Sequence, residues 1–301
     1  MKLRVAVAML CLSTLAPGGT GRLAAYKAAD TGEPVHEYMT RAATWLGDFP
    51  EISQYLLVIE AGATHEDIFD HVYDRTDACV TITHFWDPDI GTDTKVKKMW
   101  TVSCEEWSAW VKVRQLWGMA LGEYYAQDYM QAYEYLGHVA HLLEDMTVPA
   151  HVHMDSHVYP DEYDDNYMSI EIAQLNPSEI DFLKSLGPVV IPEGYPELYW
   201  LFYTTAQVGD FYASDDDPGD MIDFEGWMDF SWLDPDNCIA AGSPEAEGDC
   251  DKSVIRSHSY FHGIRAVAGL YKLFQETVKE RSELTVSIEQ VTQLQGHDEN
   301  D

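Results

Sequence analysis

The segment LGHVAHLLEDMTVPAHVHMDSH (136–157) combines the hydrophobic pattern of a buried helix with a high density of histidine and acidic residues. The apolar residues at helical spacing are Val139, Leu142, Leu143 and Met146. They stop shortly before Pro149, which cannot continue a helix. His141 and Asp145 are four positions apart, so their side chains leave the same helix face about one turn apart. The pattern predicts a largely buried helix that carries a polar pair.

His151 follows this pair by six residues, just after the proline that ends the helix. Imidazole nitrogens and carboxylate oxygens together form a donor set that suits Zn²⁺. A simpler interpretation of a His/Asp pair is a solvated polar face. The apolar character of this helix argues against that interpretation, because a buried polar pair needs a partner and a metal ion supplies one. The sequence therefore predicts a metal site at the end of this helix.

Helical spacing extends over most of the chain, whereas alternating strand patterns are nearly absent. An acidic loop is expected at 152–165, and residues 187–251 form an irregular, insertion-like region rich in Pro, Gly and Asp. The predicted helices cover 36–49, 50–61, 104–126, 128–146, short segments up to 186, 198–212 and 254–280. We therefore expect an all-α fold, in which a single compact multi-helix domain surrounds the metal site.

The chain is strongly acidic: 52 Asp and Glu residues against 18 Lys and Arg give a formal net charge of −34 over 301 residues. Basic-patch binding to nucleic acid is excluded by this balance, because such binding depends on neutralising phosphates. Intrinsic disorder is also disfavoured, since 46% of the residues are hydrophobic and 12% are aromatic. The composition indicates a folded protein with a sizeable core.

Residues 1–25 have the pattern of a secretory signal peptide. Two basic residues precede a short apolar stretch, Val5 to Leu15, which is too short to span a bilayer. Small residues follow at Ala24 and Ala25, so cleavage there would leave Tyr26 as the first residue. A lipoprotein signal at Cys11 is disfavoured by the bulky leucine before it. We therefore expect a secreted or periplasmic protein without a transmembrane segment.

Four cysteines remain after that cleavage, and an even number in an exported chain favours two disulfides. The three possible pairings stay open, although pairing of sequence neighbours, 79 with 104 and 238 with 250, is preferred. Their spacing does not suit a structural zinc site, which usually has pairs of cysteines two to four residues apart. The four residues are Cys79, Cys104, Cys238 and Cys250.

The motif HLLEDMTVPAH (141–151) resembles the H-x₃-D-x₅-H signature of the bacterial zinc-dependent phospholipases C. Other segments resemble the same family, in the same order along the chain. They are HEYMTRAATWL (36–46), GATHED (62–67), THFWDPDIG (83–91) and GIRAVAGLYKLFQETV (263–278). Any one motif is weak evidence, but the ordered set spans about residues 26–280. The resemblance implies a catalytic domain at 26–281, followed by a flexible acidic tail at 282–301.

The resemblance also implies a set of zinc ligands. One zinc ion would be held by Asp67, His84, His141 and Asp145. A second would use His36, Asp145 as a bridge, and the terminal amine and carbonyl of Tyr26, which replaces the tryptophan usual in the family. Asp67 and Asp145 are the expected catalytic carboxylates, Asp67 because it could also orient or deprotonate the attacking water. His138 is expected to pack, and Glu144 to support the site or face solvent.

The family's third zinc site departs from its pattern here. It would use His151 and a downstream H-x₃-E, but the aligned positions are Asp164 and Met168. Methionine is a poor zinc ligand beside carboxylates. The site is therefore weakened, lost, or rebuilt from neighbouring residues such as Asp155, His157, Asp165 or Glu171. The resemblance implies two firm zinc sites and a doubtful third.

The expected function is hydrolysis of phospholipids, or of another phosphodiester, by a zinc-activated water. The related zinc-dependent single-strand nucleases are the main alternative. The HFWDPD motif and the ten residues between Tyr26 and His36 favour the phospholipase branch. A catalytically impaired, zinc-stabilised relative is the third possibility, because of Met168.

Overall fold

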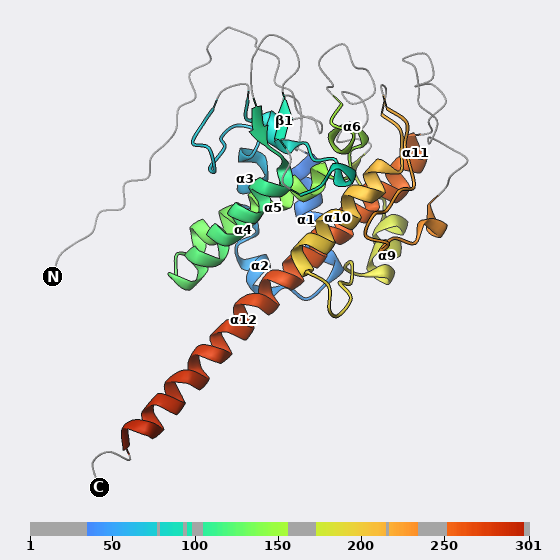
Figure 1. Ribbon diagram of the computed structural model, residues 1–301. Helices are drawn as coiled ribbons and strands as arrows, with labels where there is room; N and C mark the ends of the chain where they lie inside the picture. Colours follow the sequence, from blue (N-terminus) through green and yellow to red (C-terminus); the bar gives the residue numbers. More distant parts are fainter. Residues whose placement is uncertain are drawn as a thin grey trace, which may run out of the picture.

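The computed structural model describes residues 35–76, 79–92, 95–97, 105–155, 173–214, 217–233 and 252–297. Within these residues the protein is all-α apart from one short two-stranded ribbon (Figure 1). The α-helices are α1 Val35–Ala43, α2 Pro50–Gln54, α3 Leu56–His65, α4 Ala109–Tyr125, α5 Tyr129–Asp145, α6 Pro149–Val152, α9 Pro177–Leu186, α10 Glu197–Asp210, α11 Lys252–Ile255 and α12 Phe261–His297. The predicted fold class is therefore confirmed.

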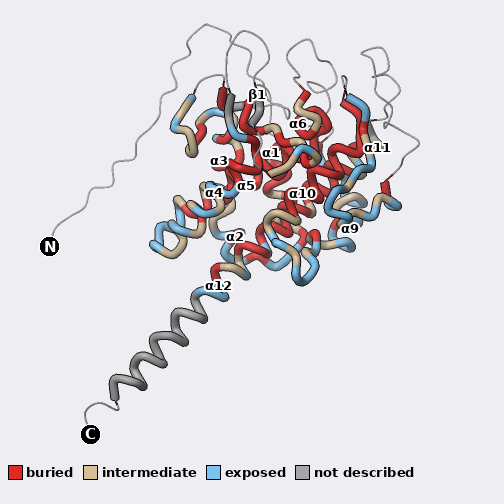
Figure 2. Tube along the Cα trace, viewed as in Figure 1, coloured by how far each residue is buried: buried red, intermediate tan, exposed pale blue. Residues whose placement is uncertain are grey.

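Helix α5 is the central element, and it packs against both α3 and α4. Every residue from Leu136 to Asp145 is buried, including its histidine and acidic side chains. Figure 2 shows this burial as a red band through α5 and the adjoining part of α1. Because the polar side chains lie inside the molecule, they must find partners there rather than in water.

A second group of helices, built around α12, also packs against α5. Helix α12 packs against α1, α5 and α10, and α10 also contacts α6. A π-helical segment, Arg256–Tyr260, joins α11 to α12. The helix observed here extends beyond the predicted C-terminal limit at residue 280, because α12 continues to His297. Its last part projects away from the body (Figure 1). The predicted helix at 198–212 agrees with α10.

Three other predicted helices have different bounds in the structure. The predicted helix at 36–49 ends as an α-helix at Ala43 and continues only as the 3₁₀ helix Thr44–Leu46. The predicted helix at 104–126 begins only at Ala109, because strand β2 (Glu105–Trp107) pairs antiparallel with β1 (Lys95–Lys97). The predicted helix at 50–61 is divided at Tyr55, whose ring stacks on Tyr133 of α5 at 4.4 Å between centroids. This tertiary contact overrides the local helical pattern.

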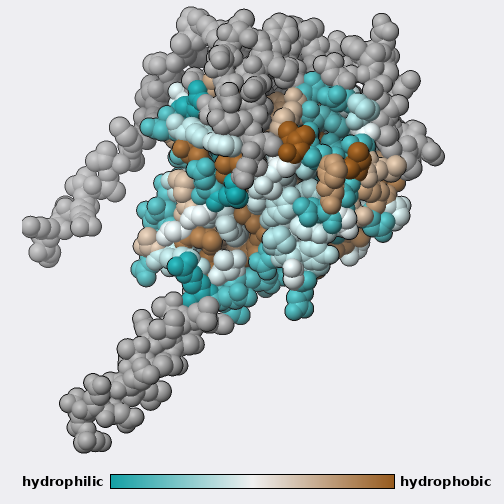
Figure 3. Space-filling model, in the orientation of Figure 1, coloured by the Kyte–Doolittle hydropathy of each residue, from teal (hydrophilic) through white to brown (hydrophobic). Residues whose placement is uncertain are grey.

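Helix α5 keeps the bounds predicted from the sequence to within one residue at each end. The predicted helix at 128–146 is α5, and Asp128 caps it by accepting a hydrogen bond from the Gln131 amide. Among the helices of the described residues, none has both the length and the apolar character needed to cross a bilayer. The face seen in Figure 3 mixes hydrophilic areas with smaller hydrophobic clusters.

Candidate metal centre

Two glycines set the distance between α3 and α5. An added Cβ at Gly137 would lie 2.1 Å from the carbonyl oxygen of Ile59, and one at Gly62 would lie 2.2 Å from that of Glu134. No side chain fits in either place, so the two backbones touch. The contact explains why α3 continues through Gly62, where the sequence predicted a turn. It also brings Asp67, two residues beyond α3, against the end of α5.

Four of the predicted ligands converge at this point. The Oδ2 atom of Asp145 lies 3.0 Å from Nδ1 of His84 and 3.2 Å from Nε2 of His141. Those two imidazole nitrogens are 3.2 Å apart. The Oδ1 atom of Asp67 lies 3.7 Å from both of them. The side chains come from the turn after α3, from the 3₁₀ helix Thr81–His84 and from α5. Those of His84, His141 and Asp145 are almost fully buried, whereas Asp67 lies at the edge of the cluster.

His36 of α1 extends the cluster on the other side of His141. The two rings stack with centroids 3.7 Å apart, and Nε2 of His36 lies 3.6 Å from Oδ1 of Asp145. The other ring nitrogen of His36 is 2.7 Å from Oε2 of Glu144, and Oε1 of the same carboxylate accepts a hydrogen bond from Thr40. Glu144 therefore supports the site rather than facing solvent. A carboxylate behind a histidine in this way fixes the ring of a metal ligand.

His151 closes the cluster from α6. Its Nδ1 atom lies 3.6 Å from Oδ1 of Asp145 and 3.2 Å from the carbonyl oxygen of His84. Its ring stacks on Phe85 at 4.5 Å, and its own carbonyl accepts the Trp86 amide at 3.1 Å. The segment after α5 and the segment around His84 are thus held together by backbone and ring contacts.

The charges of the cluster favour a cation. Burial alone would lower the pKa of His141, but Asp145 and Asp67 outweigh it and raise that pKa to about 10. Burial would raise the pKa of Asp145, yet His141 and His151 hold it well below its usual value. Burial, then the neighbouring His141, lowers the pKa of His36. The carboxylates thus draw positive charge to the centre, which a proton or a metal ion can supply.

The donor atoms fit a metal ion. His141 donates from Nδ1 to the carbonyl oxygen of Ala63 at 2.6 Å, which leaves Nε2 facing Asp145 as the nitrogen that would bind a metal in place of a proton. The Oδ2 atom of Asp145 is buried without a hydrogen-bond partner, although two imidazole nitrogens are close to it. Neutral imidazoles oriented from behind and a bare carboxylate oxygen are what zinc sites in proteins use. Two overlapping donor sets result: His36, His141 and Asp145, and Asp67, His84 and His141.

A buried ion network behind the centre was not predicted from the sequence. Lys112 of α4 is fully buried, contacts Oε1 of Glu66, and lies 2.8 Å from Oδ2 of Asp70. The other Glu66 oxygen is 2.5 Å from Nδ1 of His138, so His138 is buried as expected but also pairs with a carboxylate. Burial would raise the pKa of Glu66, but Lys112 and His138 hold it far below its usual value. This network fixes the residue directly before Asp67.

Some predicted residues lie outside the described part of the chain. These are the signal peptide, Tyr26, Asp164 with Met168, and the cysteines at 104, 238 and 250. Cys79 is described and is disulfide-bonded. Its pairing with Cys104 stays a prediction, as do the terminal ligand and the third zinc site.

Among the solved structures that this chain resembles in fold are two clostridial toxins. The alpha-toxin of Clostridium perfringens from avian strain SWCP is 16% identical with a TM-score of 0.41, over 82% of this chain and 65% of the toxin chain. The alpha toxin from Clostridium absonum is 20% identical with a TM-score of 0.45, over 83% of this chain and 66% of that one. The chain thus spans about two thirds of each toxin's length. No protein-family model and no curated protein sequence matches it.

These similarities are weak and concern the fold alone. The predicted resemblance to zinc-dependent phospholipases C therefore stays a prediction. The function proposed below therefore rests on the donor atoms that the structure brings together around Asp145.

Proposed function

We propose that this chain is an exported zinc-dependent phosphodiesterase of the phospholipase C type. The observation that carries the proposal is the convergence of Asp67, His84 and His141 on a buried Asp145 oxygen that has no hydrogen-bond partner. The residues that would hold zinc are His36, Asp67, His84, His141 and Asp145, with the terminus of Tyr26. His151 lies within reach of the same centre and would serve a third ion.

Asp145 contacts different imidazoles with its two carboxylate oxygens. Both oxygens of Asp145 face imidazoles, Oδ1 that of His36 and Oδ2 those of His84 and His141, so Asp145 can bridge two ions. Zinc ions held there would supply a Lewis acid for a phosphate oxygen and lower the pKa of water. Glu144 would hold one of these ligands, His36, in position.

Asp67 is the carboxylate best placed to act on a substrate. Its side chain is 9% exposed, whereas that of Asp145 is 1% exposed. An acid at the rim of the centre can orient a water molecule or accept its proton while the buried ligands stay fixed. Glu144, 2.7 Å behind His36, holds that imidazole in place during the reaction.

A phospholipid is the proposed substrate, and a single-stranded nucleic acid is the alternative. The formal charge of −34 would repel a polyanion over its whole length, whereas a zwitterionic head group presents one phosphodiester without net charge. Charge thus favours the lipid. The two substrates call for the same metal chemistry, so only turnover distinguishes them.

The test is metal analysis of the purified protein combined with turnover of two substrates. Zinc should co-purify at two or more ions per chain, and phosphatidylcholine vesicles should yield diacylglycerol and phosphocholine. Asp145→Asn should lose activity by a factor of at least about 10³ together with at least one zinc ion. Asp48→Asn, at an exposed acid, is the matched control and should behave like the unchanged protein.

Three outcomes contradict the proposal in different ways. Full activity in Asp145→Asn would refute the bridging role. Cleavage of single-stranded DNA without release of diacylglycerol would replace the substrate with nucleic acid. Bound zinc without turnover of either substrate would make the chain a zinc-stabilised protein rather than an enzyme.

Export has its own test. The amino-terminal sequence of the protein recovered outside the cytoplasm should begin at Tyr26, ten residues before His36. A start at any other residue would remove the proposed terminal ligand and leave His36 and Asp145 to hold the second ion.

A further inference from the structure

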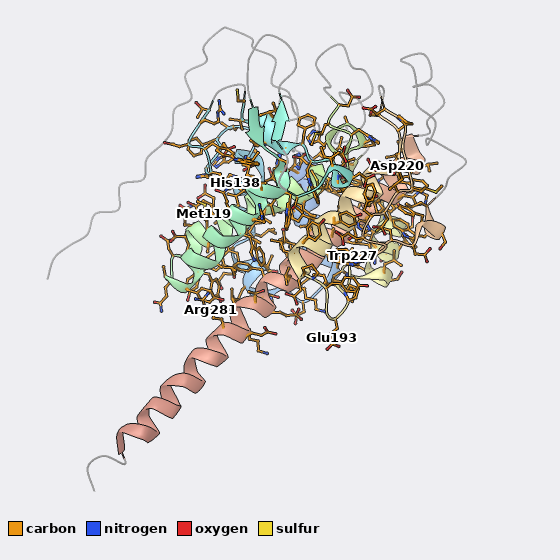
Figure 4. All side chains as sticks on the ribbon, viewed as in Figure 1. Met119, His138, Glu193, Asp220, Trp227 and Arg281 are labelled. Carbon is orange, nitrogen blue, oxygen red and sulfur yellow. The ribbon has the colours of Figure 1, made fainter. Side chains whose placement is uncertain are left out.

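A second acidic cluster lies beside α10, apart from the metal centre. Carboxylate oxygens of Asp89, Asp210 and Asp220 lie within 4.8 Å of one another. Asp89 belongs to the 3₁₀ helix Pro88–Ile90, Asp210 is the last residue of α10, and Asp220 lies in the loop that follows. Figure 4 labels Asp220 near α10 and α11, away from His138 on α5. The cluster shares no member with the proposed zinc ligands.

The backbone holds the three acids in this arrangement. The Asp220 amide donates to the carbonyl oxygen of Asp210 at 3.1 Å, so the loop returns to the helix end. A Cβ added at Gly219 would lie 2.2 Å from the carbonyl oxygen of Phe211, so only glycine allows this return. Asp87 caps the 3₁₀ helix by accepting the Asp89 amide at 2.8 Å. The cluster is therefore a product of the fold and not of chance rotamers.

Two buried oxygen atoms at this place have no hydrogen-bond partner. Asp210 is 3% exposed and Gln207, one turn earlier on α10, is fully buried. Oδ2 of Asp210 and Oε1 of Gln207 are both unsatisfied. The Gln207 amide lies against the cluster, because its Nε2 donates to Oδ1 of Asp89 at 2.6 Å. Buried acceptors without a donor are costly unless a cation or a proton serves them.

One imidazole is close, but it contacts only one oxygen of Asp210. His153 approaches Oδ1 of Asp210 with its Nδ1 at 3.2 Å and donates from Nε2 to the carbonyl oxygen of Tyr212 at 2.9 Å. Burial, and then the neighbouring carboxylates, raise the pKa of Asp210 to about 9. The negative charges of the cluster are thus not balanced by the side chains around it.

We propose that Asp89, Asp210 and Asp220, with the amide oxygen of Gln207, form a calcium site distinct from the zinc centre. All four donors are oxygens, which suit a hard cation and not zinc. Calcium accepts six to eight oxygens in irregular geometry, and the partial exposure of Asp89 and Asp220 leaves room for water to complete the shell. Magnesium usually keeps several of its waters and binds through one or two carboxylates, so a set of four protein oxygens suits calcium better.

The site would join parts of the chain that also serve the zinc centre. Asp89 follows His84 by five residues, and His153, which contacts Asp210, follows His151 by two. A calcium ion would therefore tie the loop after α10 to the two segments that carry these imidazoles. We expect calcium to raise the melting temperature of the zinc-loaded protein by mass action.

The experiment is equilibrium dialysis of the zinc-loaded protein against radioactive calcium, with zinc content measured in parallel. One calcium ion per chain should bind, and Asp89→Asn and Asp210→Asn should each weaken binding at least tenfold while zinc content stays the same. Asp220→Asn, at the more exposed edge, gives a second reading should Asp210→Asn fold poorly. Asp181→Asn, at an exposed acid of α9, is the matched control and should bind calcium unchanged.

Three results would overturn the proposed calcium site. Absence of calcium binding up to millimolar concentration would overturn the proposal and leave a proton shared among the acids as the explanation of the cluster. Equal calcium affinity in the control and in all the cluster variants would place any bound ion elsewhere. Zinc displacing calcium from the cluster at equal concentration would contradict the choice of a hard cation.

Discussion

Replacing Gly137 with alanine should separate α3 from α5 and damage the metal centre at a distance. The new Cβ would lie 2.1 Å from the Ile59 carbonyl oxygen, whereas a carbon and an oxygen in contact are about 3.3 Å apart. The helices must therefore move apart by about 1.2 Å. Asp67 lies two residues beyond α3, so its Oδ1 would recede from Nε2 of His141, which is now 3.7 Å away.

The size of the effect follows from the packing. Overfilling a tight core contact costs about 1–3 kcal/mol of unfolding free energy. For a chain of this size that corresponds to a fall in melting temperature of about 2–10 °C. Zinc ligand distances tolerate only about 0.2 Å of error, so we expect zinc affinity to fall at least about tenfold as well.

The assay is thermal unfolding of the zinc-loaded and chelator-treated forms, with zinc affinity from competition with a chelator. Gly118→Ala is the matched control, because an added Cβ there meets nothing within 4 Å and the residue is exposed on α4. The control should gain roughly 0.5–1 kcal/mol of stability, since alanine is the better helix former. Equal melting temperatures and equal zinc affinities in the two variants would refute the role given to the glycine contact.

Three further predictions concern buried polar groups. Glu144→Gln should weaken zinc binding roughly 10–100-fold, because the carboxylate that orients His36 is lost. Unchanged zinc affinity, measured by competition with a chelator, would contradict this. Lys112→Met should cost about 3–5 kcal/mol in chemical denaturation, because two buried carboxylates lose their cation, whereas Lys184→Met at an exposed site should cost little. Burial lowers the pKa of His262 from 6.5 to about 3, so the unfolded chain binds the extra proton and stability falls as the pH drops below about 6.5. His262→Gln should therefore lose less stability than the unchanged protein between pH 7 and pH 4.5, by up to about 2.7 kcal/mol. Parallel curves of unfolding free energy against pH would contradict this.

The sequence alone was enough for the fold class and for the helices with strong patterns. Apolar spacing around His141 predicted the bounds of α5 within one residue at each end. It failed where a distant contact decides the local structure, as at Tyr55, which stacks on Tyr133 and divides α2 from α3. Strand β2 was missed because three residues are too few for a strand pattern to stand out.

The candidate site was predicted less completely than the fold. The His141/Asp145 pair was visible because two polar residues recur one turn apart in an apolar helix. The network of Glu66 with Lys112 was not visible, because each residue looks like an ordinary surface charge and the pair is far apart in the sequence. The contact between Glu144 and His36 could not be predicted for the same reason, since only the fold brings α1 against α5. The acid cluster at Asp210 likewise depends on a loop that no motif describes.

The most direct test of the central claim is anomalous X-ray scattering at the zinc edge from crystals of the mature protein. We predict one zinc peak between Oδ2 of Asp145 and the imidazoles of His84 and His141, and another between Oδ1 of Asp145 and His36. Asp67 should lie within bonding distance of the first. Diffraction data from zinc-supplied crystals that show hydrogen-bonded side chains at this centre and no anomalous peak would contradict the claim.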